Sequence, residues 1–374
     1  MTPATATTPS LITPTELAGR LGRGEAITVL DVREGGPAAV EAETALGVRV
    51  PAAVALADPA TLAARLAGPV AVVCNRGQIA QPVARALRAH GVDAAVLEGG
   101  VRGWIAALRE FPVELGLDGL EVRQVQRPGR GCMSYVLAAG GRAVVVDPAP
   151  DPGFYIELAR DLGARVTDVV DTHLHADHLS GARELAERAG AALRMPAASL
   201  DRGVAYADAV EPLADGDRLD LAGVELRALA LPGHTTDMTG LLVADRALIS
   251  GDSVFADGLA RPDLERGDPA GARAMARLLH ATLAERVLGL GDRIVVLPGH
   301  DHPVVRASAL APTLGEVRAA VPELSIADPD AFAEELVAEL PPRPANYESV
   351  IAVNAGRRPS DPDLESGANS CATR

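Results

Sequence analysis

Several features that mark other classes of protein are missing from this chain. Among its 374 residues no apolar run approaches the ~20 residues that a membrane-spanning helix needs, and the N-terminal segment MTPATATTPS lacks the basic and apolar regions of a secretory signal. Only three cysteines are present, widely spaced and odd in number, so no disulfide framework is expected. These absences predict a cytoplasmic protein without a membrane partner.

Positive charge is also scarce. The chain carries 35 basic residues, all of them arginine, against 50 acidic ones, which gives a formal charge of −15. Because no local basic run offsets this deficit, nucleic acid is not expected as a partner.

At roughly 150 residues per domain, the length predicts two or three domains, each able to bury its own core.

The first third of the chain alternates short apolar segments with amphipathic ones. The strand-like segments lie at 27–32, 70–74 and 93–100, and the helix-like ones at 61–68 and 81–91. Apolar strands separated by amphipathic helices are typical of a parallel sheet with crossover helices. We therefore predict a small α/β domain over residues 11–113, followed by a linker at 114–119.

The segment 120–357 has a different pattern, in which hairpins alternate with helices. Glycines at 140 and 141 predict a turn between two apolar strands. Helices are expected at 154–163, 181–190 and 271–288, with further strands between them. We predict two sheets flanked by helices, an αββα sandwich. The polar tail 358–374, which contains Cys371, is expected to be disordered.

A dense group of metal-ligand side chains follows the strand-like segment VTDVV. Within six residues, the motif THLHADH contains three of the eight histidines and one carboxylate: His173, His175, Asp177 and His178. Further candidates follow later strand-like segments, each directly after a glycine: His234, Asp252 and His300. A small residue before each ligand lets the backbone turn sharply and bring the side chain to a shared site. Burying so many ionisable groups without a metal would cost several kcal/mol, so the sequence predicts a metal centre.

The remaining histidines and cysteines are weaker candidates. His90 and His280 lie on predicted helices and are interpreted as structural residues, whereas His302 is left open. Cys132 could lie near the site, but it is interpreted as a buried, inert thiol. None of these residues is needed to form the predicted metal centre.

Five motifs in this order resemble the metallo-β-lactamase superfamily and, within it, the persulfide dioxygenase (sulfur dioxygenase) branch. They are RPGRGCMSY (127–135), DTHLHADHLSG (171–181), SGDSVFADGLARPD (250–263), LPGHD (297–301) and LPPRPANYESVIAVN (340–354). The resemblance covers Leu120 to about Gly356. It implies a metallo-β-lactamase fold that acts on a thiol persulfide and O2.

The same resemblance implies the metal and its ligands. One iron(II) per chain, or zinc as the alternative, would be held by a 2-His-1-carboxylate set that leaves positions open for a substrate sulfur and dioxygen: His173, His234 and Asp252. The remaining members would orient these ligands or the substrate, or hold a second metal as in the hydrolytic relatives: His175, Asp177, His178 and His300. Of these, Asp177 is expected to act in catalysis. Arg261, nine residues after Asp252, matches the position at which the family contacts a thiol-peptide substrate.

The first domain contains a candidate nucleophile. Cys74 ends an apolar strand and precedes a short glycine-containing loop and a helix, where backbone N–H groups can stabilise a thiolate or persulfide anion. The segment 11–112 resembles a single rhodanese domain: Asp31 and Arg33 match its early DxR, and LEGGVRGW (97–104) matches its late GG-x-x-x-W. The resemblance implies that Cys74 carries sulfane sulfur.

Two departures from the rhodanese pattern stand out. Ile79 takes the place of the arginine that commonly ends the family's loop, and RVPAA (49–53) replaces the usual HIPGA. Arg76, within the loop, could supply the missing positive charge and bind the substrate. Because the nucleophile is retained, we expect a catalytically competent domain, with a degenerate docking or regulatory domain as the alternative.

Together these features predict a two-domain enzyme of sulfur metabolism. The second domain would oxidise a low-molecular-weight thiol persulfide, such as glutathione persulfide, with O2 to sulfite and thiol, and the first would exchange sulfane sulfur through Cys74. One alternative is a glyoxalase-II-like zinc thioester hydrolase with a regulatory rhodanese domain. Another is a sulfide- or redox-responsive binding protein with a structural metal. The acceptor thiol, the direction of sulfur transfer and the oligomeric state, a homodimer included, are left open.

Overall fold

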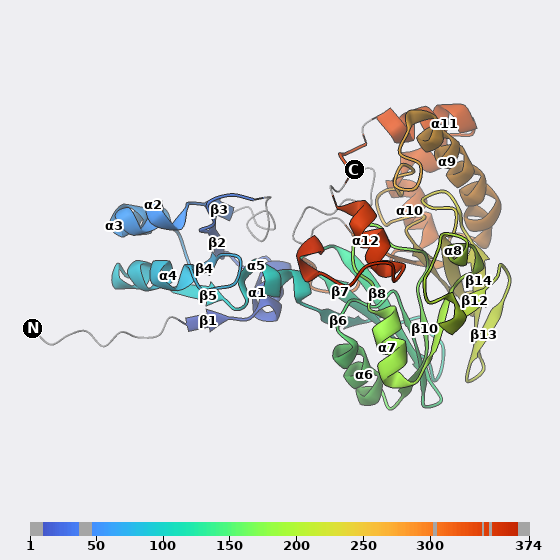
Figure 1. Cartoon of the computed structure of the whole chain (residues 1–374), viewed down its shortest axis with the longest axis horizontal. Helices are drawn as coiled ribbons and strands as arrows, with labels where there is room; N and C mark the ends of the chain where they lie inside the picture. The colour runs from blue at the N-terminus through green and yellow to red at the C-terminus, as the bar shows by residue number, and fades with distance from the viewer. Residues whose placement is uncertain (1–9, 37–46, 302–304, 339, 344–345, 366–374) are drawn as a thin grey trace, which may run out of the picture. The chain divides into compact units, whose positions relative to one another are not determined.

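The chain folds as two compact units. The computed structural model describes residues 10–36, 47–301, 305–338, 340–343 and 346–365. The first unit holds the residues up to Arg109 with two short later segments, and the second unit holds the remainder. In Figure 1 the first unit runs from blue to cyan and the second from teal to red.

The first unit is built on a parallel sheet. Its strands are β1 (Ser10–Ile12), β2 (Thr28–Asp31), β3 (Gly47–Arg49), β4 (Val70–Val73) and β5 (Ala94–Leu97), in the order β1-β5-β4-β2-β3. Every neighbouring pair in that order is parallel, as the alternating pattern predicts. The helices are α1 (Pro14–Gly22), α2 (Ala52–Ala57), α3 (Pro59–Arg65), α4 (Ala80–Ala89) and α5 (Gly100–Ala106).

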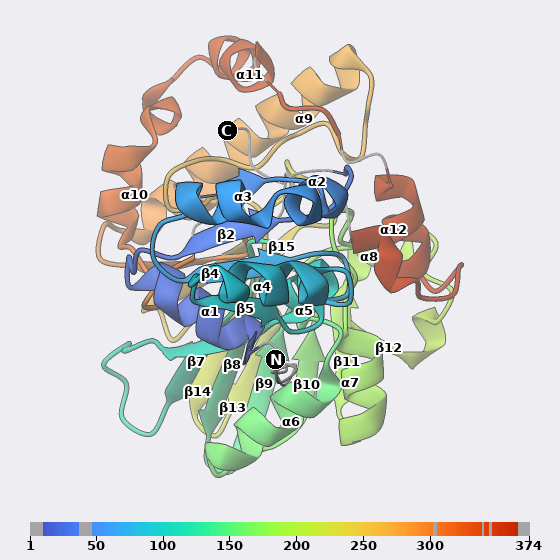
Figure 2. The same cartoon turned by 90° about the vertical axis from the view of Figure 1, so that its left-hand side faces the viewer.

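Both faces of this sheet are covered, which explains why its strands are apolar throughout. Val70 and Val72 of β4 pack in one cluster with α2, α3 and α4. Ala71 and Val73 point the other way and pack in a second cluster with α1 and with Trp104 of α5. Figure 2 shows α4 lying against β4 and β5. The predicted α/β architecture of this unit is confirmed.

The second unit contains two sheets. The first has the strands β6 (Arg109–Pro112), β7 (Glu121–Arg127), β8 (Cys132–Ala139), β9 (Arg142–Val146), β10 (Arg165–Val170), β11 (Ala192–Pro196) and β12 (Val210–Leu213), arranged in chain order. The second has β13 (Arg218–Leu221), β14 (Val224–Ala230), β15 (Thr239–Val243), β16 (Ala247–Gly251) and β17 (Val295–Pro298), also in chain order. The predicted hairpin is present: β8 and β9 are antiparallel, and Gly140 and Gly141 between them both have positive φ.

Helices cover the outer faces of the two sheets. They are α6 (Pro152–Asp161), α7 (Ala182–Ala189), α8 (Ala197–Leu200), α9 (Pro269–Thr282), α10 (Leu314–Ala320), α11 (Pro329–Ala338) and α12 (Tyr347–Asn354). Tyr135 and Leu137 of one sheet share a core cluster with Leu226 and Leu241 of the other. Leu242 and Leu248 point outward and pack against α9, α10 and α11. The αββα prediction is therefore confirmed.

Two predicted boundaries need correction. β6 already pairs within the first sheet of the second unit, so the boundary lies near Arg109, before the predicted linker 114–119. This strand has no apolar run, because its residues are only half-buried or exposed, and the pattern therefore missed it. The tail is not disordered from its start: Pro362–Glu365 forms a 3-10 helix, and Glu365 is buried.

Some features of the sequence are not placed. Cys371, His302 and the last nine residues lie outside the described residues. Within the described part of the chain, no helix is long and apolar enough to cross a membrane.

Candidate metal centre

The predicted ligands follow the C-terminal ends of four strands. His173 follows β10, His234 follows β14, Asp252 follows β16, and His300 follows β17. Strands β14, β16 and β17 run in the same direction, so their C-terminal ends share one edge of the sheet. The N–H of Thr239, at the start of β15, donates to the carbonyl oxygen of Thr172 at 2.9 Å and joins the end of β10 to this edge. The fold therefore brings loops that are distant in sequence to one place.

Glycine is required where the backbone passes close to the site. Gly251 has a φ of +49°, and a Cβ there would lie 2.2 Å from Cε of Met238 and 2.9 Å from Oγ1 of Thr172. At Gly299, a Cβ would lie 2.5 Å from Oδ1 of Asp252. A side chain at Gly299 would therefore meet the proposed ligand Asp252, and one at Gly251 would meet residues packed beside the site.

Three ligand atoms converge, and they belong to the residues that the family resemblance implies as ligands. Nε2 of His173 and Nε2 of His234 lie 3.9 Å and 3.7 Å from Oδ2 of Asp252. All three atoms are buried, and within the described residues none has a hydrogen-bond partner. A single ion with bonds of about 2.0–2.2 Å can bridge atoms at this spacing, so these residues fit a metal.

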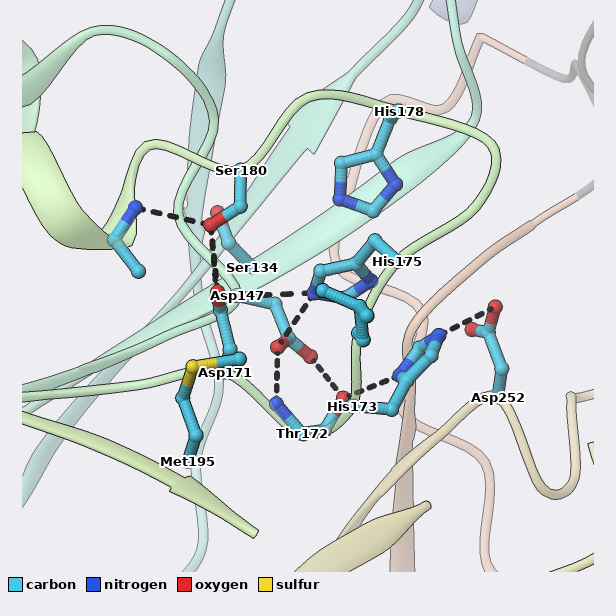
Figure 3. Close-up of polar contacts among 12 residues, drawn as sticks. Ser134, Asp147, Asp171, Thr172, His173, His175, His178, Ser180, Met195 and Asp252 are labelled. Carbon is cyan, nitrogen blue, oxygen red and sulfur yellow. Dashed lines mark hydrogen bonds and ion pairs between the residues drawn. The ribbon is translucent and has the colours of Figure 1, made fainter. Parts of the chain in front are cut away.

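The other atom of each imidazole is held by a hydrogen bond. Nδ1 of His173 lies 3.0 Å from Oγ1 of Thr172, whose hydroxyl donates to Oδ2 of Asp147 at 2.9 Å (Figure 3). Nδ1 of His234 lies 2.9 Å from the carbonyl oxygen of Arg261. Because the hydroxyl proton of Thr172 is directed to Asp147 and a carbonyl only accepts, both Nδ1 atoms carry the proton and both Nε2 lone pairs face the site.

The charges of the three residues also suit a metal. Burial lowers the pKa of His173 well below its usual value, and His175 and His234 lower it further, so the ring is neutral. Burial raises the pKa of Asp252, but His300 and His234 outweigh that effect and lower it. A neutral imidazole of His173 and the carboxylate of Asp252 therefore face a common point.

His175 does not join the three converging residues. Its Nε2 atom lies 3.1 Å from Oδ1 of Asp147 and 3.7 Å from Oδ1 of Asp171, and Figure 3 shows the ring between the two carboxylates. Burial opposes protonation of this ring, but the two aspartates outweigh it and raise the pKa of His175 well above its usual value. His175 is thus an imidazolium that neutralises buried aspartates behind the site.

The other predicted members form a second group with one unexpected residue. Ligand atoms of Asp177, His178, His300 and Cys132 all lie within 4.8 Å of one another. Burial raises the pKa of the Cys132 thiol, but His178 and His300 outweigh burial and bring it to about 6. Burial lowers the pKa of His178, but Cys132 and Asp177 outweigh it and raise that pKa to about 9. Cys132 therefore lies among the site residues with a lowered pKa, and the interpretation of an inert thiol is not supported.

One residue that the sequence analysis did not single out holds the metal loop. Nδ2 of Asn354, at the end of α12, donates to the carbonyl oxygens of His175 and His178 at 3.0 Å and 2.8 Å. Its Oδ1 atom accepts from the N–H of Ser180 at 3.0 Å. Asn354 is the last residue of the motif LPPRPANYESVIAVN, so the motif drew attention to this segment of the sequence. Nothing in the motif shows which backbone groups Asn354 binds.

Two further carboxylates were also missed. Oε1 of Glu365 accepts from the N–H of Leu179 at 2.9 Å, and Oδ2 of Asp237 accepts from the N–H of Leu174 at 2.9 Å. Asp237 is in turn paired with Arg202 at 2.6 Å. These partners come from distant parts of the chain, so no local pattern signals them.

Arg261 is placed differently from what a substrate contact requires. Its side chain is fully buried, with Nε 2.7 Å from Oδ1 of Asp263 and Nη2 2.6 Å from the carbonyl oxygen of Pro341. Together with its carbonyl bond to His234, this geometry makes Arg261 a positioning residue. A direct contact with substrate stays a prediction.

The cysteine loop lies in the first unit. Cys74 follows β4 and precedes α4, as predicted, and its side chain is buried. Its carbonyl oxygen accepts from the N–H of Val101 at 2.9 Å. Arg76 and Ile79 are exposed on the loop. The positions of these residues suit a sulfur-carrying loop, whereas their roles stay predictions.

Two other predicted residues of this unit form a buried ion pair. Nη2 of Arg33 lies 2.7 Å and Nη2 of Arg49 lies 2.8 Å from Oδ2 of Asp31. The DxR pair therefore lies within the protein and does not present its guanidinium to a ligand.

His280 of the second unit is structural, as expected, because its Nε2 lies 2.8 Å from the carbonyl oxygen of Ile326.

Comparison with known proteins identifies the family of each of the two units. Residues 127–300 match the Metallo-beta-lactamase superfamily, and residues 13–107 match the Rhodanese-like domain. A hydroxyacylglutathione hydrolase of Anaeromyxobacter dehalogenans is 34% identical over 241 residues, which cover 61% of this chain and 82% of that protein. The chain belongs to the metallo-β-lactamase superfamily. In this superfamily member the metallo-β-lactamase unit follows a rhodanese-like one.

Relatives of this superfamily member have two different activities. A hydroxyacylglutathione hydrolase of Acidiphilium cryptum is 35% identical over 174 residues, which cover 46% of this chain and 66% of that protein. The mitochondrial persulfide dioxygenase ETHE1 of Homo sapiens is 27% identical over 212 residues, which cover 55% of this chain and 76% of that protein.

Solved structures share the fold of this superfamily member. ETHE1 from Myxococcus xanthus aligns with a TM-score of 0.53 and 25% identity, over 63% of this chain and 99% of that one. A metallo-beta-lactamase from Staphylococcus aureus aligns with a TM-score of 0.58 and 24% identity, over 64% of this chain and 73% of that one. The second likeness concerns the fold alone.

Proposed function

We propose that this protein is an iron persulfide dioxygenase with a sulfurtransferase domain. The observation that carries the proposal is the buried set of His173, His234 and Asp252, whose free ligand atoms face one another while His175 is bound between two aspartates. Two imidazoles and one carboxylate with open positions are typical of non-haem iron(II) enzymes that use O2. Two histidines and one carboxylate also hold zinc in some hydrolases, so the identity of the bound metal decides between the two activities.

The proposed reaction is RSSH + O2 + H2O → RSH + SO3²⁻ + 2H⁺, where RSSH is a low-molecular-weight thiol persulfide. The terminal sulfur is oxidised to sulfite, O2 is reduced, and the S–S bond breaks with the thiol as leaving group. Iron(II), when bound, supplies a redox-active Lewis acid at which the sulfur anion and O2 can meet.

The residues of the chain set up this chemistry before substrate arrives. The carbonyl of Arg261 and the hydroxyl of Thr172 fix the rings of His234 and His173. His300 fixes Asp252 through an Nδ1 to Oδ1 contact of 2.7 Å. Each of these hydrogen bonds orients a ligand through an atom that does not face the metal site, so the other coordination positions stay free for the two reactants.

The proposed role of Cys74 is to carry sulfane sulfur. In one direction, Cys74–S–S⁻ + SO3²⁻ → Cys74–S⁻ + S2O3²⁻, in which sulfite attacks the outer sulfur and the Cys74 thiolate leaves. In the other direction, Cys74 delivers that sulfur to a thiol, RS⁻ + Cys74–S–S⁻ + H⁺ → RSS⁻ + Cys74–SH, which would supply the dioxygenase. Backbone N–H groups at the start of α4 suit the anion in both cases.

The test is metal analysis of anaerobically purified protein together with O2 uptake on addition of glutathione persulfide. About one iron per chain, with O2 uptake and sulfite release, is the expected result. Zinc at about two per chain without O2 uptake would overturn the proposal.

A thioester hydrolase is the second candidate. The group of Cys132, Asp177, His178 and His300 favours it, because a second ion could bind there next to the first. Hydrolysis of S-lactoylglutathione at a rate rivalling O2 uptake would support this activity.

A further inference from the structure

Cys132 is a buried nucleophilic group that the proposed reaction at the metal centre does not use. It begins β8, and its Sγ atom lies within 4.8 Å of ligand atoms of Asp177, His178 and His300. These three residues belong to the loops that follow β10 and β17. The fold therefore brings a thiol, two imidazoles and a carboxylate together from three distant parts of the chain.

Backbone hydrogen bonds fix Cys132 beside His300. The two residues form an isolated antiparallel bridge between the start of β8 and the chain that follows β17. Next to this bridge, the N–H of Met133 donates to the carbonyl oxygen of Gly299 at 2.7 Å. His178 is held by the Nδ2 atom of Asn354, which donates to its carbonyl oxygen at 2.8 Å. The thiol and its neighbours thus have fixed positions before a substrate binds.

The contacts within this group are those that activate a nucleophile. Nδ1 of His178 lies 2.9 Å from Oδ1 of Asp177. Because a carboxylate only accepts hydrogen bonds, Nδ1 carries the ring proton, and the lone pair of Nε2 can take a proton from the thiol of Cys132. A nucleophile beside a base that a third group orients is the arrangement used in covalent catalysis.

Cys132 is more accessible than the proposed metal ligands. Its exposed fraction is 7%, whereas that of the ligands is 1% for His173, 1% for Asp252 and 0% for His234. A substrate that approaches from solvent therefore meets the thiol before it meets the ligands.

A polar atom next to His178 is left without a partner. The ring of His175 packs against the rings of His178 and His173, with centroids 4.3 Å and 4.2 Å apart (Figure 3). Its Nδ1 atom is buried and has no hydrogen-bond partner in the part of the chain that the structure describes. Because buried polar atoms are normally hydrogen-bonded, this atom favours the entry of a polar ligand group between the metal ligands and the group of Cys132.

We propose that Cys132 is a second acceptor of sulfane sulfur, which holds the outer sulfur of the substrate as a persulfide. The step is RSSH + Cys132–SH → RSH + Cys132–SSH. The thiolate of Cys132 attacks the outer sulfur, the S–S bond breaks, and the proton taken up by His178 passes to the leaving thiolate. No oxidant is needed, because the sulfane sulfur only changes its partner.

This step divides the reaction of the proposed function into two halves. The second half is Cys132–SSH + O2 + H2O → Cys132–SH + SO3²⁻ + 2H⁺, in which the held sulfur is oxidised and O2 is reduced. This half rests on the proposed function, whereas the first half requires no O2. Nδ1 of His300 lies 2.7 Å from Oδ1 of Asp252, so a single side chain links the group of Cys132 to a proposed metal ligand.

The test is mass spectrometry of the iron-loaded full chain after glutathione persulfide is added without O2 and the remaining thiols are alkylated. Trypsin cuts after arginine, so the three cysteines fall in separate peptides, with Cys132 in residues 131–142. We expect one added sulfur on Cys132 and on Cys74, with glutathione released before O2 is admitted. Cys371 reports unselective modification. No added sulfur on Cys132, or no more than on Cys371, would overturn the proposal.

A second outcome of the same experiment also decides. A mixed disulfide of Cys132 with glutathione, formed with release of sulfide, would mean that the thiolate attacks the inner sulfur. Cys132 would then not hold sulfane sulfur, and the proposal would be wrong.

His178→Gln tests the base. The variant should slow sulfur uptake by Cys132 about 100-fold or more, the usual contribution of a general base, while uptake by Cys74 in the same molecules is unchanged. His90→Gln, which changes an exposed histidine at the end of α4, is the matched control, and the melting temperature of both variants reports folding. Equal rates at Cys132 in His178→Gln and the wild type would contradict the role of His178.

Cys132→Ser separates this inference from the proposed function. Serine cannot hold sulfane sulfur, so the variant should release less glutathione without O2 and should take up O2 more slowly. If the wild type takes up O2 and Cys132→Ser does so at the same rate, the dioxygenase stands and the inference is wrong. If Cys132 of the wild type takes up sulfur but no O2 is consumed, the inference stands and the proposed reaction is wrong.

Discussion

Nδ1 of His300 lies 2.7 Å from Oδ1 of Asp252, so the carboxylate proposed to bind the metal is itself fixed by a histidine of the second group. This contact turns Oδ2 of Asp252 toward the two converging imidazoles. Removing it would leave the carboxylate free to rotate, and groups that orient a ligand in this way typically contribute 10- to 100-fold to metal affinity.

We therefore expect His300→Ala to lower the affinity for iron(II) about 10- to 100-fold. The measurement is competition with a coloured chelator under anaerobic conditions. His90→Ala, an exposed histidine at the end of α4, is the control and should leave iron affinity unchanged. Equal affinity of His300→Ala and the wild type would show that Asp252 is fixed without His300.

Asn354→Ala is expected to loosen the metal loop. The substitution removes three hydrogen bonds and leaves the carbonyl oxygens of His175 and His178 without this partner. The expected loss is about 2–3 kcal/mol in the free energy of unfolding, since buried polar groups are costly to leave unsatisfied. Urea denaturation measures it, with Ser349→Ala on the same helix as control. A loss no greater than that of the control would contradict the role given to Asn354.

The parts of the fold that the sequence revealed are those with short-range patterns. VTDVV predicted a strand because three of its five residues are valine, and the paired glycines at 140 and 141 predicted the hairpin because both must adopt positive φ. His173, His234 and Asp252 were among the candidates because each follows such a strand, and the resemblance to the persulfide dioxygenase branch then selected them as the ligand set.

Other features depend on contacts between residues that are far apart in the sequence. His175 is in the same motif as His173, yet it lies between Asp147 and Asp171, and only the packing of β9 beside β10 brings Asp147 to it. Cys132 looked inert because its neighbours His178 and His300 come from other loops. The strand β6 was missed because a half-buried edge strand has no apolar run.

The pairing of Asp237 with Arg202 predicts a specific dependence on pH. Burial raises the pKa of Asp237, but Arg202 outweighs it, with Ser199 and the N–H of Leu174 adding to the effect, so the pKa is lowered from 3.8. A carboxyl with a lower pKa in the folded state stabilises that state above the unfolded value and loses this contribution as pH falls. Asp237→Asn should therefore be less stable than the wild type at pH 7, and this difference should shrink below pH 3.8.

Urea denaturation of both proteins at several pH values measures that difference. Asp161→Asn is the control, because its carboxylate is exposed and, in the part of the chain that the structure describes, pairs only with the neighbouring Arg160. A difference between Asp237→Asn and the wild type that stays constant down to the lowest pH would contradict the linkage.

Cys74→Ser separates the two proposed activities. Serine cannot carry sulfane sulfur, so transfer of sulfur between thiosulfate and an acceptor should be abolished. Uptake of O2 with added glutathione persulfide should persist, because the metal ligands all lie in the other unit. Sulfurtransferase turnover that survives in Cys74→Ser would show that another group carries the sulfur.

Arg261→Gln decides between a substrate contact and a positioning role. The guanidinium is fully buried and binds Asp263 and the carbonyl oxygen of Pro341, so its loss breaks a buried ion pair at a cost of about 3–5 kcal/mol. We expect Arg261→Gln to lower the melting temperature, and Asp263→Asn, which breaks the same pair from the other side, to lower it as well. Both variants should also lower iron affinity, because the carbonyl of Arg261 holds the ring of His234.

A substrate contact would separate these two variants. If Arg261 bound the substrate carboxylate directly, Arg261→Gln would raise the KM for glutathione persulfide with little change in melting temperature, and Asp263→Asn would not. Thermal unfolding and steady-state kinetics on the same preparations distinguish the two outcomes. The burial of Arg261 favours the first, because a side chain without exposed surface reaches a ligand only if the segment at Pro341 moves away.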